Sequence, residues 1–419
     1  MSELSYLEKL LDGVVVEWKT LEDISIKISS GGTPKTGVSE FYDGDIPWLR
    51  TQEVNFCDIW DTEVKITESG VKNSSAKWIP KNCVIVAMYG ATVGKIGINK
   101  IPMTTNQACA NIQLNEEVAH YRYVFHFLCS QYTYIKSLGT GSQTNINAQI
   151  VKNIKIPIPC PENPEKSLAI QSEIVRILDK FTALTAELTA ELTAELNMRK
   201  KQYNYYRDQL LSFKEGEVEW KALGEVAKIQ RGASPRPIVN YLTEQGNGIP
   251  WIKIGDTIPG SKYIDKTLQK ITAEGAQKSR ILNPGDFVIS NSMSFGRPYI
   301  LRITGAIHDG WASISNFGEK LNADYLYHYL SSKKVKNYWE SKINSGSVSN
   351  LNADIIKTLP VPLPDKQKQE RISALLDKFD TLTNSITEGL PREIELRQKQ
   401  YEYYRDLLFN FPKPETVSN

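Results

Sequence analysis

Four histidines are the side chains of this sequence best suited to proton transfer or metal binding near neutral pH. They are His120, His126, His308 and His328. His120 and His126 are six residues apart, which places them on different faces of a helix, and no acid–histidine pair recurs in both halves of the chain. We therefore interpret all four as core or surface residues with ordinary hydrogen-bond partners, rather than as catalytic groups.

Five cysteines offer the other route to metal or redox chemistry, and all of them fall between Cys57 and Cys160. No two have Cys-x-x-Cys spacing, so a zinc site lacks its ligands and a disulfide framework is not expected. Buried thiols and no metal site are the expectation.

The segment GATVGK (90–95) superficially resembles a phosphate-binding loop. It has only three residues between Gly90 and Gly94, and Ile96 stands where such a loop needs a magnesium-binding Ser or Thr. A strand–turn–strand whose glycines take unusual backbone angles is the better interpretation. The sequence also lacks an Asn/Asp-Pro-Pro-Tyr methyltransferase motif, a Gly-rich dinucleotide fingerprint and a nuclease-like group of acids. We expect a non-catalytic chain without a cofactor of its own.

Length and composition describe a soluble protein of more than one domain. The chain has 419 residues with 41% hydrophobic and 23% charged side chains, which is typical of two or three globular domains. The N-terminus lacks the apolar core of a signal peptide and no run is long enough to span a membrane, so a cytoplasmic protein is expected. A net charge of +2 argues against a polybasic chain but not against a local basic cleft.

An internal repeat organises the whole sequence. RILDKFTALT (176–185) returns as ALLDKFDTLT (374–383), and LNMRKKQYNYYRDQLLSF (196–213) returns as IELRQKQYEYYRDLLFNF (394–411). Both pairs are offset by 198 residues, and apolar positions agree throughout. The two copies therefore have equal length between these motifs.

A looser repeat precedes each of these segments. SGGTPKT answers RGASPRP, IPWLR (46–50) answers IPWIK (249–253), and GTGSQTNINAQIVKNIKIPIP (139–159) answers NSGSVSNLNADIIKTLPVPLP (344–364). Between these anchors the halves diverge strongly. One scaffold thus carries two different surfaces, which is the pattern expected of two different specificities.

The local patterns predict two mixed α/β domains, each followed by a long helix. Short β-rich runs with Gly, Pro and Asn punctuation indicate strands and loops, and Trp48 and Trp251 are expected to fill cores. The first long helix should run from about Ser167 to Phe213, roughly 70 Å, while Gly389 and Pro391 predict a kink or break in the second. The expected divisions are an N-terminal helical arm (1–17), a first globular domain (18–160), a central helical region (161–215), a second globular domain (216–364), a C-terminal helical region (365–411) and a tail (412–419).

Two divergent domains alternating with two near-identical helical regions resemble the specificity subunit of a type I restriction–modification enzyme. The resemblance covers essentially the full chain. It implies a mixed α/β fold in which two target-recognition domains are separated by two long helices packed as an antiparallel coiled coil, with an internal pseudo-two-fold repeat. Each domain would read one half of a bipartite, asymmetric double-stranded DNA site. The helical regions would dock two methyltransferase subunits, which use S-adenosylmethionine, and restriction subunits would add ATP- and Mg-dependent translocation and cleavage.

Polar loop residues of the two domains are the candidates for contact with phosphates and base edges. Arg236 and Arg297 rank highest, because arginine can pair bidentately with guanine and both lie where the halves diverge. The candidate DNA-binding residues are Ser30, Thr33, Lys35, Arg50, Tyr89, Lys95, Ser142, Gln143, Asn145, Arg231, Ser234, Arg236, Lys253, Asn291, Ser294, Arg297, Ser347 and Asn350.

The helical regions carry apolar stripes that either pack helix against helix or dock another subunit. Leucines recur every four residues in the Thr-Ala-Glu-Leu repeat, and tyrosines recur in YNYYRD and YEYYRD. We favour core packing for the inner residues. The candidates are Leu184, Leu188, Leu192, Leu196, Tyr203, Tyr206, Tyr401 and Tyr404.

The same repeat is also interpreted as a spacer between the two domains, because one unit adds roughly 6 Å of helix. Two alternatives to a DNA-recognition subunit stay open: a coiled-coil adaptor that binds only proteins, and an orphan DNA-modifying enzyme with unfamiliar motifs. Affinity for DNA that falls as salt rises would argue against the adaptor.

Overall fold

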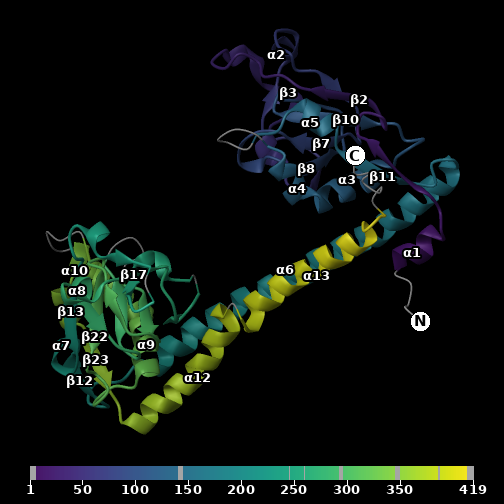
Figure 1. The fold of residues 1–419 in the computed structure, drawn as a ribbon. Coiled ribbons are helices and arrows are strands. Elements are labelled where there is room, and N and C mark those ends of the chain that lie inside the picture. The colour runs from purple at the N-terminus through teal and green to yellow at the C-terminus, as the bar shows by residue number, and fades with distance from the viewer. Residues whose placement is uncertain are drawn as a thin grey trace. The chain divides into compact units, whose positions relative to one another are not determined.

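The computed structural model describes residues 6–139, 145–244, 246–258, 260–291, 296–344, 350–385 and 387–412 (Figure 1). The chain forms two compact units. The first unit comprises Met1–Glu187 with Arg397–Asn419, and the second comprises Leu188–Leu396.

The first unit is built on two main sheets and a two-stranded ribbon. One sheet has the order β2-β10-β7-β8-β4, another has the order β5-β3-β9-β6, and β1 pairs with β11. The described strands are β1 (Val16–Thr20), β2 (Ser25–Ser30), β3 (Tyr42–Leu49), β4 (Cys57–Ile59), β5 (Lys65–Ile66), β6 (Trp78–Ile79), β7 (Val84–Ala87), β8 (Ile96–Asn99), β9 (Met103–Thr105), β10 (Cys109–Leu114) and β11 (Lys155–Pro159). All four residues of β7 are buried, as expected for a central strand covered on both faces.

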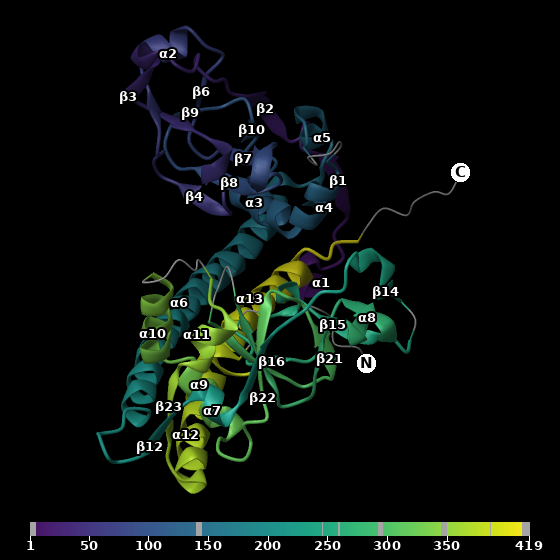
Figure 2. The same ribbon diagram turned by 90° about the vertical axis from the view of Figure 1, so that its left-hand side faces the viewer.

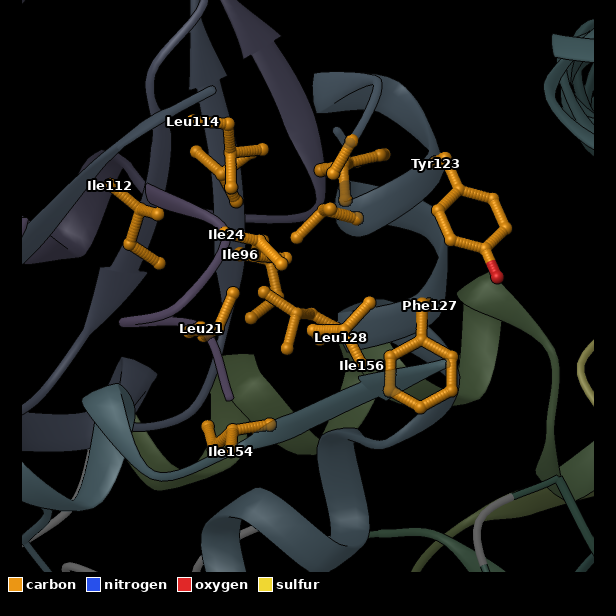
Figure 3. Close-up of a cluster of buried hydrophobic side chains, with 14 of the residues drawn as sticks. Leu21, Ile24, Ile96, Ile112, Leu114, Tyr123, Phe127, Leu128, Ile154 and Ile156 are labelled. Atoms are coloured by element: carbon orange, nitrogen blue, oxygen red, sulfur yellow. The ribbon is translucent and has the colours of Figure 1, made fainter. Parts of the chain in front are cut away.

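Helices cover the larger sheet of the first unit, and α3 packs on β7 and β8 (Figure 2). The apolar spacing of YRYVFHFLCS buries Tyr123, Phe127 and Leu128 of this helix. Figure 3 shows these three side chains in one cluster with Ile112 and Leu114 of β10. The described helices are α1 (Tyr6–Leu11), α2 (Glu68–Lys72), α3 (Tyr121–Ser130), α4 (Tyr132–Ser137) and α5 (Ala148–Lys152).

The second unit repeats this topology, with five strands instead of four in its second sheet. Its sheets have the orders β13-β22-β19-β20-β16 and β14-β17-β15-β21-β18, and β12 pairs with β23. The described strands are β12 (Glu219–Ala222), β13 (Lys228–Arg231), β14 (Leu242–Thr243), β15 (Ile249–Ile252), β16 (Tyr263–Ile264), β17 (Gln269–Ile271), β18 (Arg280–Leu282), β19 (Phe287–Ser290), β20 (Pro298–Leu301), β21 (Gly305–Ile307), β22 (Trp311–Ser315) and β23 (Pro360–Leu363). The described helices are α7 (Leu223–Val226), α8 (Ala273–Gln277), α9 (Ala323–Leu330), α10 (Lys333–Asn344) and α11 (Ala353–Lys357). The repeat read from the sequence is therefore a repeat of fold.

The long helices agree with the sequence prediction. The first, α6, runs over Pro164–Leu210, and Asn163 caps it by accepting the amide of Lys166 at 3.0 Å. The second is broken: α12 (Lys366–Asn384) ends before α13 (Gly389–Leu408), which begins at a glycine with φ +78°. The predicted break near Gly389 and Pro391 is confirmed. Among the described helices, none combines the length and apolarity of a membrane span.

Two further local expectations are confirmed, and the expectation of buried thiols holds for two of the five cysteines. GATVGK forms a turn between β7 and β8, with φ of +82° at Gly90 and +80° at Gly94. Trp48 and Trp251 are buried in small cores of their units. All five cysteines are free thiols; Cys83 and Cys109 are buried, and the other three are half-buried.

Candidate nucleic-acid interface

Four predicted DNA-binding residues of the second unit converge on one acid that the sequence interpretation missed, Asp309. Ser234 Oγ donates to its Oδ1 at 2.9 Å, and Nη2 of Arg236 lies 3.3 Å from its Oδ2. Its backbone carbonyl accepts from Nε of Arg231 and from Nδ2 of Asn291, each at 3.4 Å. The structure thus brings residues at the ends of β13 and β19 to the turn that carries Asp309, and two of them bond its carboxylate.

Backbone bonds at the ends of the large sheet hold these loops together. Gly232, directly after β13, donates its amide to Trp311 O at 2.8 Å, and a Cβ at this position would overlap the carbonyl oxygen of His308. Asn291, directly after β19, donates its amide to Gly310 O at 3.0 Å. The turn between β21 and β22 is therefore clamped from both sides, which explains why glycine stands at 232.

The first unit builds the same arrangement from different side chains. Gly32 donates to Thr105 O at 2.9 Å, as Ala233 donates to Ile307 O at 3.3 Å in the second unit. Met88 donates to Ala108 O at 2.8 Å, as Asn291 donates to Gly310 O. In this frame Thr33 bonds Gln107, as Ser234 bonds Asp309. Lys35 stands at the position of Arg236 and is exposed. Gln107 and Asp309 are thus equivalent positions with different chemistry.

The charge at Asp309 follows from its partners. Partial burial raises the pKa of this carboxyl, but the Ser234 hydrogen bond, together with the nearby His308 and Arg236, outweighs burial and holds the pKa below its usual range. Asp309 is therefore anionic at neutral pH, and it neutralises part of the positive charge that Arg236 presents. Gln107 supplies no such charge in the first unit.

The remaining candidates of the first unit lie in different settings. Ser30 lies in β2 opposite Ala110, and Arg50 is engaged by Glu53 and Glu63. Nζ of Lys95 donates to Asn55 at 2.8 Å. Tyr89 is exposed at the turn after β7. Asn145 lies near the same turn, because the amide of the next residue, Ile146, donates to the backbone carbonyl of Met88. The candidates Ser142 and Gln143 lie outside the described residues.

In the second unit, Arg297 is separate from the Asp309 cluster. Its guanidinium lies 5.3 Å from the ring centre of Tyr299, and it lines a cavity of about 500 Å³ together with Arg207 and Lys336. Nζ of Lys253 donates to Gln269 at 2.7 Å, and Asn350 is exposed. The candidates Ser294 and Ser347 lie outside the described residues.

The expectation that no acid–histidine pair recurs in both halves is wrong. Nε2 of His126 lies 2.7 Å from Asp179, and Nε2 of His328 lies 2.8 Å from Asp377. Both acids belong to the LDKF motifs of the long helices, and both histidines are buried on the first helix after the large sheet. Because each carboxylate also binds a cation, Arg122 in the first unit and Lys262 in the second, the pairs fasten a helix to a domain and are not catalytic dyads.

The tyrosines of the two helical repeats differ in burial. Tyr203 is buried, and its hydroxyl lies 2.9 Å from Nδ1 of His328. Tyr206 stacks on Phe379 in the second unit at 5.6 Å, and Tyr404 packs on Phe181 in the first at 5.7 Å, so each copy's tyrosine meets the other copy's LDKF phenylalanine. The half-buried Tyr401 bonds Thr182 at 3.1 Å.

None of the four leucines of the Thr-Ala-Glu-Leu repeat is fully buried. Leu188, Leu192 and Leu196 are half-buried, and Leu184 is 51% exposed.

The repeated domain, the repeated loop cluster and the repeated helix anchor define a class of protein. The family model for the type I restriction modification DNA specificity domain matches residues 15–198 and again residues 215–396. The chain belongs to this family. It is a specificity subunit, which recognises DNA sequence and is non-catalytic by family.

Particular relatives match over nearly the whole chain. The specificity subunit of the Escherichia coli type I restriction enzymes EcoR124I/EcoR124II is 42% identical over 425 residues and covers 100% of both chains. The Escherichia coli EcoprrI specificity subunit is 38% identical and covers 93% of each chain.

Solved structures agree in fold. A chain from a type I restriction–modification system, studied for its complex assembly and conformational transition, has a TM-score of 0.67 at 19% identity and covers 94% of this chain and 97% of its own. The HsdS subunit from Thermoanaerobacter tengcongensis has a TM-score of 0.50 at 18% identity and covers 94% and 95%.

Proposed function

We propose that this chain recognises a bipartite, asymmetric DNA site, with one half read by each domain. The observation that carries the proposal is the pair of equivalent loop clusters. The same backbone clamp presents Thr33, Lys35 and Gln107 in one domain. In the other it presents Ser234 and Arg236 on Asp309. Since base edges are distinguished by their donors and acceptors, two identical frames with different side chains read two different sequences.

The chain also positions the subunits that carry out chemistry. The near-identical helical segments expose matching aromatics: Tyr205 is 62% exposed and Tyr403 is 61% exposed, and each lies edge-on to the next tyrosine. A surface that occurs twice in one chain suits two copies of the same partner, which we take to be the methyltransferase subunit. S-adenosylmethionine, ATP and Mg belong to the methyltransferase and restriction subunits in this proposal.

A domain exchange tests the reading of half-sites. Residues 18–160 are replaced by the first domain of another family member, and the modified bases in the host genome are mapped by methylome sequencing. One half of the site should change while the other half and the spacer persist. Changes in both halves would overturn the modular proposal.

A salt titration separates DNA recognition from the protein-only adaptor. Affinity of the complex for its site should fall linearly with the logarithm of salt concentration, because bound phosphates release counterions. An affinity without salt dependence would favour the adaptor.

A further inference from the structure

We propose that Asp309 is a positioning residue that holds Arg236 for recognition of a guanine in the half-site of the second domain. The inference rests on the proposed function and adds that Arg236 contacts the base while Asp309 holds Arg236 in place. Neither residue alone suggests this role. The role is inferred from the contact between the two side chains and from their unequal exposure.

Arg236 is presented to solvent while it is tethered at one end. Its side chain is 82% exposed, whereas that of Asp309 is 25% exposed. A single contact, Nη2 to Oδ2 at 3.3 Å, joins them and leaves most of the N–H groups of the guanidinium available. Guanine O6 and N7 accept two parallel hydrogen bonds from such a fork.

Hydrogen bonds from three other residues hold Asp309 in place. Ser234 bonds its other carboxylate oxygen, and Arg231 and Asn291 bond its backbone carbonyl. A fixed carboxylate restricts the rotamers of Arg236, so less conformational entropy is lost when the arginine meets a base. The carboxylate also lowers the net positive charge around the guanidinium of Arg236, which weakens its attraction to the phosphates of unrelated DNA sequences.

The first domain serves as an internal comparison. Lys35 replaces the fork with a point charge, and the neutral Gln107 stands where the carboxylate would be. Among the described residues, no ion pair of Lys35 is found. The device is therefore present in one half of the molecule and absent from the other, so only one half-site should depend on it.

The test measures binding of the complex, assembled with its methyltransferase subunits, to a library of duplexes that vary each base pair of both half-sites. Arg236→Ala should lower the preference for guanine at one position of the second half-site by about 10- to 100-fold. Asp309→Asn should lower the same preference by about 3- to 10-fold, while raising affinity for unrelated DNA and steepening its salt dependence. Preferences in the first half-site should persist in both variants.

Two further variants separate positioning from direct readout and from a purely structural role. In the Arg236→Ala background, Asp309→Asn should change base preference no further; an additional change would mean that Asp309 contacts a base itself and would overturn the proposal. Ser234→Ala loosens the loop but keeps the carboxylate, so it should preserve the guanine preference within about 3-fold. Because Arg236 is a surface residue, its variant tests the proposal even if Asp309→Asn misfolds.

The remaining outcomes are decisive as well. If Arg236→Ala weakens all sequences equally and reduces the salt slope, Arg236 is a phosphate contact and the proposal fails. If the wild-type complex shows no sequence preference, the proposed function itself fails.

Discussion

His328 Nε2 lies 2.8 Å from Oδ1 of Asp377, and the same oxygen lies 2.7 Å from Nζ of Lys262. The first unit has the equivalent bond between His126 and Asp179. Around it, the positive and negative side chains come from the opposite elements. There the α3 helix supplies the cation, Arg122, and β4 supplies the second acid, Asp58.

In the second unit the helix and the strand have exchanged charges. The α9 helix supplies the second acid, Asp324, and the segment before β16 supplies the cation, Lys262. A common histidine–aspartate bond thus sits in two charge networks of opposite layout. The anchor is maintained in both units, although the two charged side chains around it differ in type and position.

Removal of Lys262 should destabilise the second unit strongly. Its side chain is only 7% exposed and binds Asp324 at 2.6 Å and Asp377 at 2.7 Å. Burial lowers its pKa, but these two carboxylates outweigh burial and raise it. Lys262→Met leaves two neighbouring carboxylates without their cation, which should cost about 2–4 kcal/mol of unfolding free energy in a denaturant titration.

Lys278→Ala is the matched control for this variant. Lys278 pairs with Glu274 at 2.9 Å in an exposed i,i+4 arrangement and lies 4.6 Å from the ring centre of Tyr241, so its loss should cost less than about 1 kcal/mol. Equal costs for the two lysines would show that the buried network does not stabilise the unit.

Acid should loosen the first unit through Asp179. Burial raises the pKa of this carboxyl, but hydrogen bonds from His126 and Arg122 outweigh burial and lower the pKa to about 2. A lowered pKa stabilises the fold above the unfolded value near 3.9, and this contribution is lost as pH falls through about 4 to about 2. After allowance for solvent screening of a partly exposed carboxylate, it amounts to about 1–2 kcal/mol.

Thermal unfolding between pH 2 and pH 7 checks this prediction. Asp179→Asn should be less stable at pH 7 and should lose less of its stability below pH 4 than the wild type. Asp354→Asn, which removes an exposed carboxylate paired with Lys357, should follow the wild-type profile. If the stability of Asp179→Asn fell with pH as steeply as that of the wild type, Asp179 would not be the source of the acid sensitivity.

The exposed tyrosines should determine how many methyltransferase subunits bind. Tyr205→Ala and Tyr403→Ala each remove one exposed aromatic from one copy of the helical repeat. Each should weaken one of two docking events by about 10-fold, and the double variant should weaken both. Sedimentation of the complex at increasing partner concentration measures this directly.

Tyr134→Ala is the control, because Tyr134 is comparably exposed on α4 but lies outside the repeat. If it affects assembly as much as the two repeat variants, the docking surface has been placed wrongly.

The architecture could be predicted from the sequence because the same motifs occur in both halves of the chain. Repeated motifs, proline-spaced strands and helix-breaking residues predicted two mixed α/β domains, the span of α6 and the break before α13. These features depend on local patterns, namely periodicity, Gly and Pro.

The histidine–aspartate anchors could not be predicted in this way. His126 and His328 are 202 residues apart, whereas Asp179 and Asp377 are 198 apart, so alignment of the helices does not align the histidines. The pairing depends on tertiary packing, and the charges around it are exchanged between helix and strand.

The loop clusters were predicted only in part. Polar composition singled out Ser234 and Arg236, but Gln107 and Asp309 were missed. Their equivalence becomes visible only through strand register, because β10 and β22 hold corresponding places in their sheets. A strand-guided alignment of TTNQACANI with AIHDGWASI would have matched the two positions.

Deletion of one Thr-Ala-Glu-Leu unit should shorten the spacer of the DNA site without changing its half-sites. Residues 189–192 lie inside α6, and their removal shortens the helix by about 6 Å with about 40° of rotation. Ala, Glu and Leu favour helix, so the shortened segment should stay helical. Because B-DNA rises about 3.4 Å per base pair, the preferred spacer should lose about one to two base pairs.

Thr189→Ala keeps the helix length and controls for the change of composition, so its spacer should equal that of the wild type. Methylome sequencing of cells that carry each variant reports both half-sites and the spacer together. An unaltered spacer in the deletion variant would leave the repeat with a packing role alone. A shortened spacer with constant half-sites would mean that α6 sets the distance between half-sites and that the two loop clusters set their sequences.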